Sequence, residues 1–501
     1  MEKAAVVQPL FLALALALVA GCGGTSAASE GAGYTRAPLS GDNLNLIFVV
    51  SEDLAYRAPG DINPSTANLT DRGLQRSLRM ARFLRRQVLG KKNVTGIYVL
   101  EPMTHLQTAS NYPDMVALET IEQFALLNHI TLSSTPTPQY IPYTGNSYPL
   151  NASYAPGSVP SGVAPPTLYC PNCQGLDFND QQSNNEILVT DKTAGIITAN
   201  VPGFYVFSAP WETTSALMAN INEIEGYGLT LPSRYQGPDY IYAISITPSG
   251  SASLVTYNTN LKPRSRYPAL PSPRPASTPC TAQAPFTIKV KIGEGGAEKP
   301  EGINANETLY MIRHAEAHPQ GHWDDGNYVC AGQWRALDLP NALRGKINPN
   351  QVYSIDPAQV IPGTESALGS YYSYVRPSLT VEPYAIANSL PYDLAASFEI
   401  FDPNSPQLAS NFFFTDLSGG KFSDQTVLLA WEHDHIPPTV NWLISTYFSA
   451  PYKPPVAPDW PGDDYDTIWT VTLDTGSNLT VDNAMCEGID SAKLPATCPQ
   501  F

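Results

Sequence analysis

The sequence has few charged residues. Asp, Glu, Lys and Arg make up 15% of its 501 residues, and acidic residues outnumber basic ones, which gives a formal net charge of −17. A nucleic-acid partner calls for clustered Lys and Arg, so this composition argues against one. It also means that any phosphate site must be locally positive within a negative overall field. The 47 prolines predict long loops and few long helices.

The N-terminus carries a processing signal. After a short charged start, residues 4–20 are apolar, and the segment ends in Leu18-Val19-Ala20-Gly21-Cys22. A short apolar run closed by small residues favours a cleaved secretory signal over a membrane-spanning anchor. Its end resembles the bacterial lipobox, which implies export, lipidation of Cys22 and a membrane anchor on the periplasmic or outer-membrane face. We therefore expect a lipoprotein signal peptide over residues 1–21 and a Gly/Ser/Ala-rich tether over 22–42.

Six further cysteines follow Cys22, namely Cys170, Cys173, Cys280, Cys330, Cys486 and Cys498. An even number in an exported chain predicts up to three disulfides, whose pairing the sequence does not give. Cys170 and Cys173 also fit a redox or zinc half-site, but no second CxxC or nearby His pair accompanies them. A structural bridge is the favoured interpretation.

At this length two domains are expected, and the chain indeed contains one pattern twice. The first copy spans residues 43–260, with elements at 43–50, 73–84, 96–102, 116–125, 204–208 and 239–255; the second spans 301–501, with elements at 309–312, 332–336, 352–357, 376–385, 427–430 and 464–481. Six matched elements in one order indicate a tandem duplication. Strands alternating with helices predict an α/β fold with a largely parallel sheet flanked by helices in each half.

Two segments fall outside this pattern. Residues 261–300 are Pro-rich and are predicted to link the two copies. Residues 133–185 are rich in Pro, Tyr and Ser with little periodicity, and this length is typical of a lid, a binding loop or a partly disordered insert.

The second copy carries chemical side chains that the first copy lacks. Arg313 and His314 correspond to Ser51 and Glu52, Arg376 to Val116, and His433 roughly to Pro210. In open α/β sheets, ligands bind outside the carboxyl ends of strands, where Arg313 and His314 are expected. A guanidinium suits phosphate oxygens, and an imidazole can attack phosphorus. Drift of core histidines would more often leave apolar residues than Glu and Pro, which favours a functional site.

These residues resemble the histidine phosphatase superfamily, which includes phosphoglycerate mutases and histidine acid phosphatases. Arg313-His314-Ala315-Glu316 resembles the family's Arg-His-Gly-Glu strand end, with Ala in place of Gly. The helix opening at 332–336, the second Arg before Thr-x-x-Pro-x-Ala at 376–385, and the strand and second His at 427–433 follow in the family's order. The usual Ser-Pro is Asp356-Pro357. The match covers residues 308–480, and the first copy resembles a degenerate version of the same fold.

The resemblance implies a mechanism. His314 would attack phosphorus and become phosphohistidine, Arg313 and Arg376 would clamp the phosphoryl oxygens, and His433 would stabilise the transition state. Asp434 is the first candidate for the proton donor, with Glu316, Glu382 and Glu399 as alternatives. No metal or cofactor is implied. His318, His322 and His435 fit no single face and are interpreted as rim or surface residues.

The leading hypothesis is therefore an exported, membrane-tethered phosphomonoester hydrolase acting on a small-molecule phosphoester. The alternative is a non-catalytic binding or scaffold lipoprotein of the same fold. A redox role for the Cys170–Cys173 loop is a third interpretation. The sequence leaves the substrate and the oligomeric state open.

Overall fold

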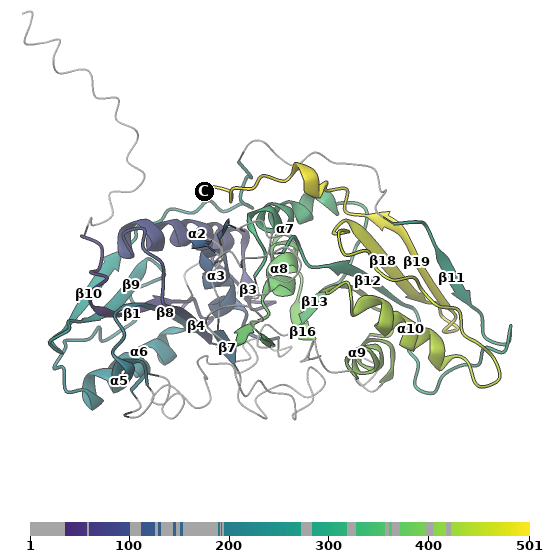
Figure 1. Cartoon of the computed structure of the whole chain (residues 1–501), viewed down its shortest axis with the longest axis horizontal. Coiled ribbons are helices and arrows are strands. Elements are labelled where there is room, and N and C mark those ends of the chain that lie inside the picture. Colours follow the sequence, from purple (N-terminus) through teal and green to yellow (C-terminus); the bar gives the residue numbers. More distant parts are fainter. Residues whose placement is uncertain are drawn as a thin grey trace, which may run out of the picture.

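The structure is a computed structural model of an α/β protein (Figure 1). Each half of the chain contains one large sheet with both parallel and antiparallel strands. The structure describes residues 36–57, 60–100, 112–125, 129–131, 144–146, 151–153, 189–190, 192, 195–271, 283–317, 327–355, 360–362, 371–395, 404–416 and 422–501. Several sequence predictions lie outside these residues: the signal peptide with Cys22, nearly all of the 133–185 insert with Cys170 and Cys173, and Cys280, His318, His322 and Glu399. Within the described residues, no helix is long and apolar enough to cross a membrane.

The first sheet is built around β1 (Leu44–Val50), whose seven residues are all buried. Its strand order is β10-β9-β1-β8-β4-β7, with β8 (Gly203–Ala209), β4 (Gly96–Leu100), β7 (Asn151–Ser153), β9 (Tyr240–Ile246) and β10 (Ala252–Asn258). The neighbours from β1 to β7 pair in parallel, whereas β9 and β10 are antiparallel. A central strand with helices on both faces has no solvent side, which explains its continuous apolar run.

The second sheet has the order β11-β19-β18-β12-β17-β13-β16. Its strands are β11 (Thr287–Val290), β12 (Glu307–Arg313), β13 (Gln351–Ile355), β16 (Tyr392–Ala395), β17 (Thr426–Trp431), β18 (Thr467–Leu473) and β19 (Leu479–Cys486). The neighbours from β12 to β16 pair in parallel, and β18, β19 and β11 add antiparallel strands at the other edge. The expectation of largely parallel sheets holds in part: the pairings from β1 to β7 and from β12 to β16 are parallel, but both sheets are mixed. The sequence pattern also missed β11, which lies inside the expected 261–300 linker.

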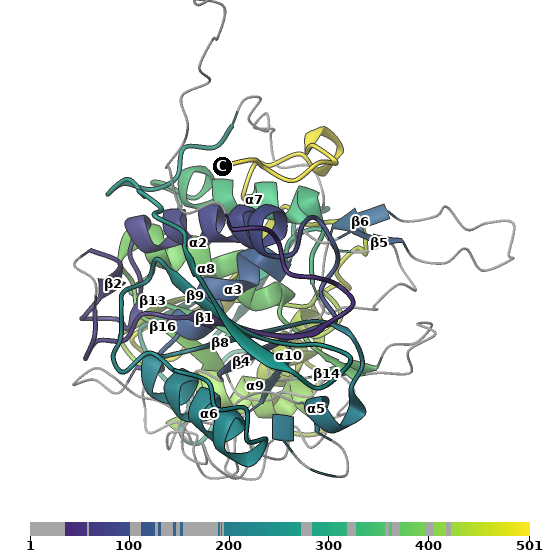
Figure 2. The same ribbon diagram turned by 90° about the vertical axis from the view of Figure 1, so that its left-hand side faces the viewer.

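Helices cover both faces of each sheet. They are α2 (Asp71–Phe83), which continues into the π-helical turn η1 (Leu84–Val88), α3 (Val116–Ala125), α5 (Ile196–Ala199), α6 (Trp211–Ile224), α7 (Cys330–Ala342), α8 (Arg376–Asn388), α9 (Ser405–Phe414) and α10 (Ile436–Thr446). Figure 2 shows the first sheet between α2 on one side and α5 and α6 on the other. Short pairs complete the described fold: β2 (Ile62–Asn63) with β3 (Asn68–Leu69), β5 (His129–Thr131) with β6 (Thr144–Asn146), and β14 (Val360–Pro362) with β15 (Tyr371–Ser373).

Local sequence explains how the inner helices begin. Thr70 caps α2, because its hydroxyl accepts a hydrogen bond from the Gly73 amide at 3.3 Å. A β-carbon on Gly73 would collide with the carbonyl oxygen of Asp61, and one on Gly332 in α7 would collide with that of Glu316. Glycine at these two positions therefore permits close contact between helix and loop.

The two halves meet through these inner helices, α2 and α3 from the first and α7 and α8 from the second (Figure 1). One buried apolar cluster continues from one half into the other. Buried polar contacts also cross the junction: Gln333 Nε2 donates to Gln123 Oε1 at 2.8 Å, and the Ser378 hydroxyl donates to Glu122 at 2.8 Å. The halves consequently share one interior along this seam.

Candidate active site

Arg313 and His314 lie at the carboxyl end of β12, in the middle of the second sheet. The His314 amide continues the ladder by donating to the Trp431 oxygen at 2.8 Å. At the same place in the first sheet, the Ser51 amide donates to the Ala209 oxygen at 3.0 Å. By strand register, the position in the first sheet that is equivalent to His314 is therefore Ser51 and not Glu52. The sequence-based pairing of His314 with Glu52 was wrong by one residue. Spacing alone could not fix it, because both strands end in polar residues.

The His314 ring is held in one tautomer. Its Nδ1 lies 2.8 Å from the Ala315 carbonyl oxygen, which can only accept, so Nδ1 carries the proton. Burial lowers the pKa of His314 well below its usual value, and the cations of Arg376 and Arg313 lower it further. The ring is therefore neutral, with an unprotonated Nε2. This is the form of imidazole that acts as a nucleophile.

The Arg313 guanidinium is buried and fixed by a loop that follows β17 and α10. Nη1 donates to the carbonyl oxygens of Gly462 at 2.7 Å and Asp464 at 3.2 Å, and Nη2 donates to the Tyr465 hydroxyl at 3.3 Å. The guanidinium also stacks over the Tyr465 ring at 3.9 Å. Its Nε has no hydrogen-bond partner among the described residues. The guanidinium is thus held in one orientation, and its Nε can still donate a hydrogen bond to a ligand.

Arg376 is the first residue of α8 and is 7% exposed. Within the described part of the chain, its buried Nε makes no hydrogen bond, and its guanidinium lies 4.9 Å from the Tyr374 ring. The same ring meets His314 edge-on, with centroids 6.1 Å apart. A buried cation beside a neutral imidazole, with an unsatisfied donor, is suited to an anionic ligand.

His433 completes the group of four. It follows β17, and its Nε2 lies 3.7 Å from where a β-carbon on Gly462 would sit, while the Gly462 oxygen binds Arg313. Burial and the Arg313 charge lower the pKa of His433. Shared neighbours thus bring all four predicted residues together: Tyr465 and Tyr374 border His314, and Gly462 joins Arg313 to His433.

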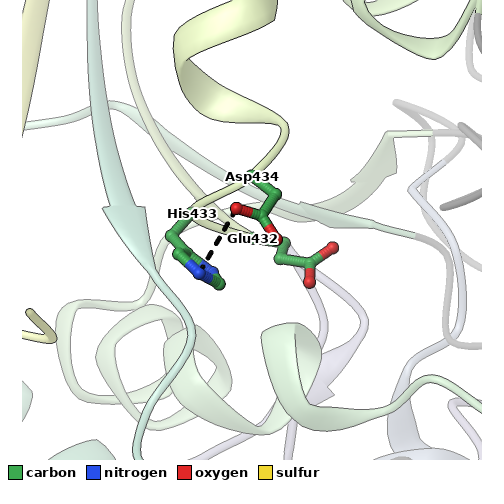
Figure 3. A group of neighbouring side chains, drawn as sticks. All are labelled: Glu432, His433 and Asp434. Carbon is green, nitrogen blue, oxygen red and sulfur yellow. Dashed lines mark ion pairs between the residues drawn. The ribbon is translucent and has the colours of Figure 1, made fainter. Parts of the chain in front are cut away.

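Two acids flank His433, as Figure 3 shows. Asp434 points back to it, with Oδ1 3.4 Å from Nε2, and its side chain is 68% exposed. Glu432 is buried and pairs with His435 Nδ1 at 3.0 Å. Burial alone would raise the pKa of Glu432, but the hydrogen bond and charge of His435 and the nearby Arg376 lower it overall. Glu432 is therefore held as a carboxylate, while Asp434 is open to solvent.

The same three residues could also hold a cation. Ligand atoms of Glu432, His433 and Asp434 all lie within 4.8 Å of one another. However, Glu432 is engaged by His435, and the Arg313 and Arg376 guanidinium groups add positive charge at this position. The local charge therefore fits an anion better than a metal ion.

Two of the acids considered as proton donors have other partners. Both oxygens of Glu316 accept from Arg335 Nε, at 2.9 and 3.0 Å. Glu382 is fully buried at the junction of the halves, where it interacts electrostatically with Glu122. His435, expected at the rim, has a side chain only 12% exposed and is paired with Glu432.

Sequence reasoning missed several residues that shape the site. Tyr374 and Tyr465 frame the imidazole, and Gly462 joins Arg313 to His433. Thr380 is the Thr of the Thr-x-x-Pro-x-Ala pattern, but its contact with the site was not expected: its hydroxyl accepts from the Ala315 amide at 2.8 Å. Tyr374 stands only two residues before Arg376, so its closeness to the site could have been predicted from the sequence. Tyr465 and Gly462 approach only through the tertiary fold.

No protein-family model matches this sequence, and no curated protein matches it. Similar solved structures include the protein described as phosphohistidine phosphatase SixA from Agrobacterium tumefaciens, with 16% identity over 34% of this chain and 92% of its own and a TM-score of 0.20. A mycobacterial glucosyl-3-phosphoglycerate phosphatase gives 14% identity, 35% and 97% coverage and a TM-score of 0.22. A SixA protein from Nakamurella multipartitia gives 16% identity over 40% of this chain and 96% of its own, with a TM-score of 0.21. These identities and TM-scores are too low to assign this chain a fold or an activity.

Proposed function

We propose that this protein is a phosphomonoester hydrolase that acts through a phosphohistidine on His314. One observation carries the proposal: the bond from His314 Nδ1 to Ala315 leaves Nε2 unprotonated among Arg313, Arg376 and His433. Only a ligand with several negative oxygens would satisfy two buried guanidinium groups and a second histidine together. A phosphoryl group has that character, and its phosphorus is open to attack by nitrogen.

The reaction would take two steps. His314 Nε2 forms a bond to phosphorus while the bond from phosphorus to the ester oxygen breaks, and Asp434 gives its proton to the departing alkoxide. Water then attacks phosphorus, Asp434 accepts a proton from it, and the phosphorus–nitrogen bond breaks to release phosphate and neutral His314. Arg313, Arg376 and His433 stabilise the phosphoryl oxygens in both steps. Asp434 is preferred as the donor because it is accessible and contacts His433, whereas Glu432 is buried and paired with His435.

The test is hydrolysis of para-nitrophenyl phosphate together with trapping of the intermediate. Wild-type protein should release para-nitrophenol and retain label from a phosphorus-32 ester after an alkaline quench, which preserves phosphohistidine. His314→Ala should lose both signals, with turnover falling at least 10³-fold. Ser51→Ala, at the equivalent strand end of the first sheet, is the matched control and should retain both. Equal inactivity of wild type and His314→Ala across a panel of phosphoesters would instead support a binding or scaffold role.

We also propose that the two halves, 43–260 and 301–501, are tandem copies of a histidine phosphatase-like domain and that the first copy has lost its chemistry. Their shared strand order from β10 to β7 and from β19 to β16 supports this. So do two equivalent ion pairs, Arg76 with Asp239 in the first half and Arg335 with Asp466 in the second. The first half would then serve as a structural partner that buries the inner face of the second.

Export and lipid anchorage through Cys22 complete the proposal. They rest on the sequence of the first residues alone. Metabolic labelling with a radioactive fatty acid should mark the wild-type chain and leave Cys22→Ser unlabelled. Label retained by Cys22→Ser would contradict this anchor without affecting the phosphatase proposal.

A further inference from the structure

Two glutamates meet at the junction of the halves, at equivalent positions of the two copies. Glu122 is the seventh residue of α3 and Glu382 the seventh of α8, and both helices have Thr at the fifth position and Ala at the tenth. Both glutamates are 0% exposed, and their carboxyl groups interact electrostatically. The two copies therefore bring the same acid from either side to one buried place.

Acids and tyrosines surround this pair. The titratable side chains that act on it, or on its nearest neighbours, come from α2, α3, α7, β16 and the segments beside them: Glu119, Asp114, Asp71, Asp338, Tyr267, Tyr328 and Tyr392. Among the described residues, only the group around His433 has three ligand atoms close enough to share a metal ion, so a bound cation does not explain the pair. Two carboxylates that meet in a dry interior cannot both stay ionised, so the closed junction holds a proton.

The geometry around Glu122 fits a protonated acid. The Ser378 hydroxyl of α8 lies 2.8 Å from Glu122 Oε1 across the junction and 2.7 Å from the Val375 carbonyl oxygen. This hydroxyl has one proton for two acceptors, so both contacts are satisfied when Glu122 carries a proton of its own. Burial raises the pKa of Glu122 and raises the pKa of Glu382 well above its usual value, which agrees with this form.

The helix that carries Glu382 also leads to the candidate active site. Arg376 begins α8, about 9 Å before Glu382 along the helix axis. The Thr380 hydroxyl donates to the Arg376 carbonyl oxygen at 2.7 Å and accepts from the amide of Ala315, the residue after His314, at 2.8 Å. A shift of α8 away from α3 would therefore move the Arg376 guanidinium and loosen the segment that carries His314.

We propose that Glu122 and Glu382 form a pH-sensitive latch through which the first half controls the candidate active site. With a proton on the pair, α3 and α8 stay packed and Arg376 remains in place near His314. When both carboxyl groups ionise, their repulsion separates the two helices, and the site loses affinity for anions. This inference rests on the proposed function, because it describes the regulation of the same site, and it gives the first half a role beyond burying the second.

The test follows the junction and the site separately in the full chain. Hydrogen exchange, compared as protection factors to remove its intrinsic pH dependence, should show α3 and α8 of the wild type losing protection between about pH 5 and about pH 8. Sulfate keeps its charge over this range and imitates a phosphoryl group, so isothermal titration with sulfate reports on the site. Its affinity for the wild type should fall about 10-fold. Glu122→Gln imitates the protonated acid and should retain the protection and most of the affinity at the higher pH.

Two further variants complete the test. Glu382→Gln should behave as Glu122→Gln does, so the test does not depend on the folding of one variant. Glu223→Gln, at an exposed position of α6, is the matched control and should behave as the wild type. The inference fails if Glu122→Gln loses as much protection as the wild type, or if protection is lost while sulfate affinity stays constant. A wild type that binds no sulfate even near pH 5 would overturn the proposed anion site, and the inference with it.

Discussion

Arg335 Nε donates to both carboxylate oxygens of Glu316, two residues beyond His314 in the sequence. Arg335 is fully buried in α7, and its other nitrogens bond to Glu487, the Ile489 carbonyl and Ser491. Burial opposes its charge, but the two glutamates raise the pKa of Arg335 overall. The segment that follows the proposed nucleophile is thus tied to a helix and to the C-terminal segment through one guanidinium.

Replacing Arg335 should therefore be strongly destabilising. Arg335→Ala leaves Glu316 and Glu487 buried without their cation, and breaking a buried pair in this way costs about 3–5 kcal/mol. Chemical denaturation should show this loss in the free energy of unfolding. Arg344→Ala, an exposed arginine two residues beyond the end of α7, is the control and should change stability by less than about 0.5 kcal/mol. A loss below about 1 kcal/mol for Arg335→Ala would show that the cluster contributes little.

The disulfide between Cys330 and Cys498 gives a second prediction. It joins the start of α7 to the C-terminal segment across 168 residues. A cross-link over so long a loop restricts the unfolded chain, so its removal should cost about 2–5 kcal/mol. Cys330→Ser and Cys498→Ser should lower the unfolding midpoint equally, and the double variant should be no worse than either. A reductant should lower the wild-type midpoint; an unchanged midpoint in the single variants would contradict the prediction.

The sequence predicted most of the central elements, because their signals are local. Buried apolar runs marked β1, β8 and β12. The sequence singled out the four chemical residues because they end apolar elements or begin a helix. Tyr465, Gly462 and the one-residue correction at Ser51 were not predictable in this way, since they depend on strand register and on loops that meet only in the fold. Likewise, the sequence could not predict that Glu382 is buried at the junction, because its acidic neighbours come from the other half.

Glu382 provides a pH test of the junction. Burial raises its pKa well above the usual value, and the neighbouring Glu122, which is also raised, adds to the effect. Glu119 of α3 belongs to the same cluster and is raised as well, first by burial. The fold therefore favours the protonated acid. Stability from this group is fully present below the carboxyl's unfolded pKa of about 4.5 and is lost as pH rises through the folded pKa.

Glu382→Gln imitates the protonated acid and should remove this loss. The variant should unfold at the same denaturant concentration as wild type near pH 4, and at a higher one near pH 8. Glu301→Gln, at an exposed position, is the control and should not change how the free energy of unfolding depends on pH. If Glu382→Gln and wild type change in parallel between these pH values, the carboxyl does not titrate in the fold as inferred.

The proposed chemistry should also depend on pH through His314. Burial, then Arg376 and Arg313, lower the pKa of His314, so the neutral nucleophile persists in acid and kcat/KM should stay high below pH 6.5. Arg376→Gln removes one of these cations, which raises the pKa of His314 and should move the acidic limb of kcat/KM to higher pH. It also removes a phosphoryl clamp, so kcat/KM should fall by about 10²–10³ at every pH. Profiles with para-nitrophenyl phosphate compare the two enzymes directly, because the substrate titrates identically in both, and Lys291→Gln, at the exposed far edge, should reproduce the wild-type limb. A fall in kcat/KM without movement of the limb would mean that Arg376 contacts the substrate but does not set the charge of His314.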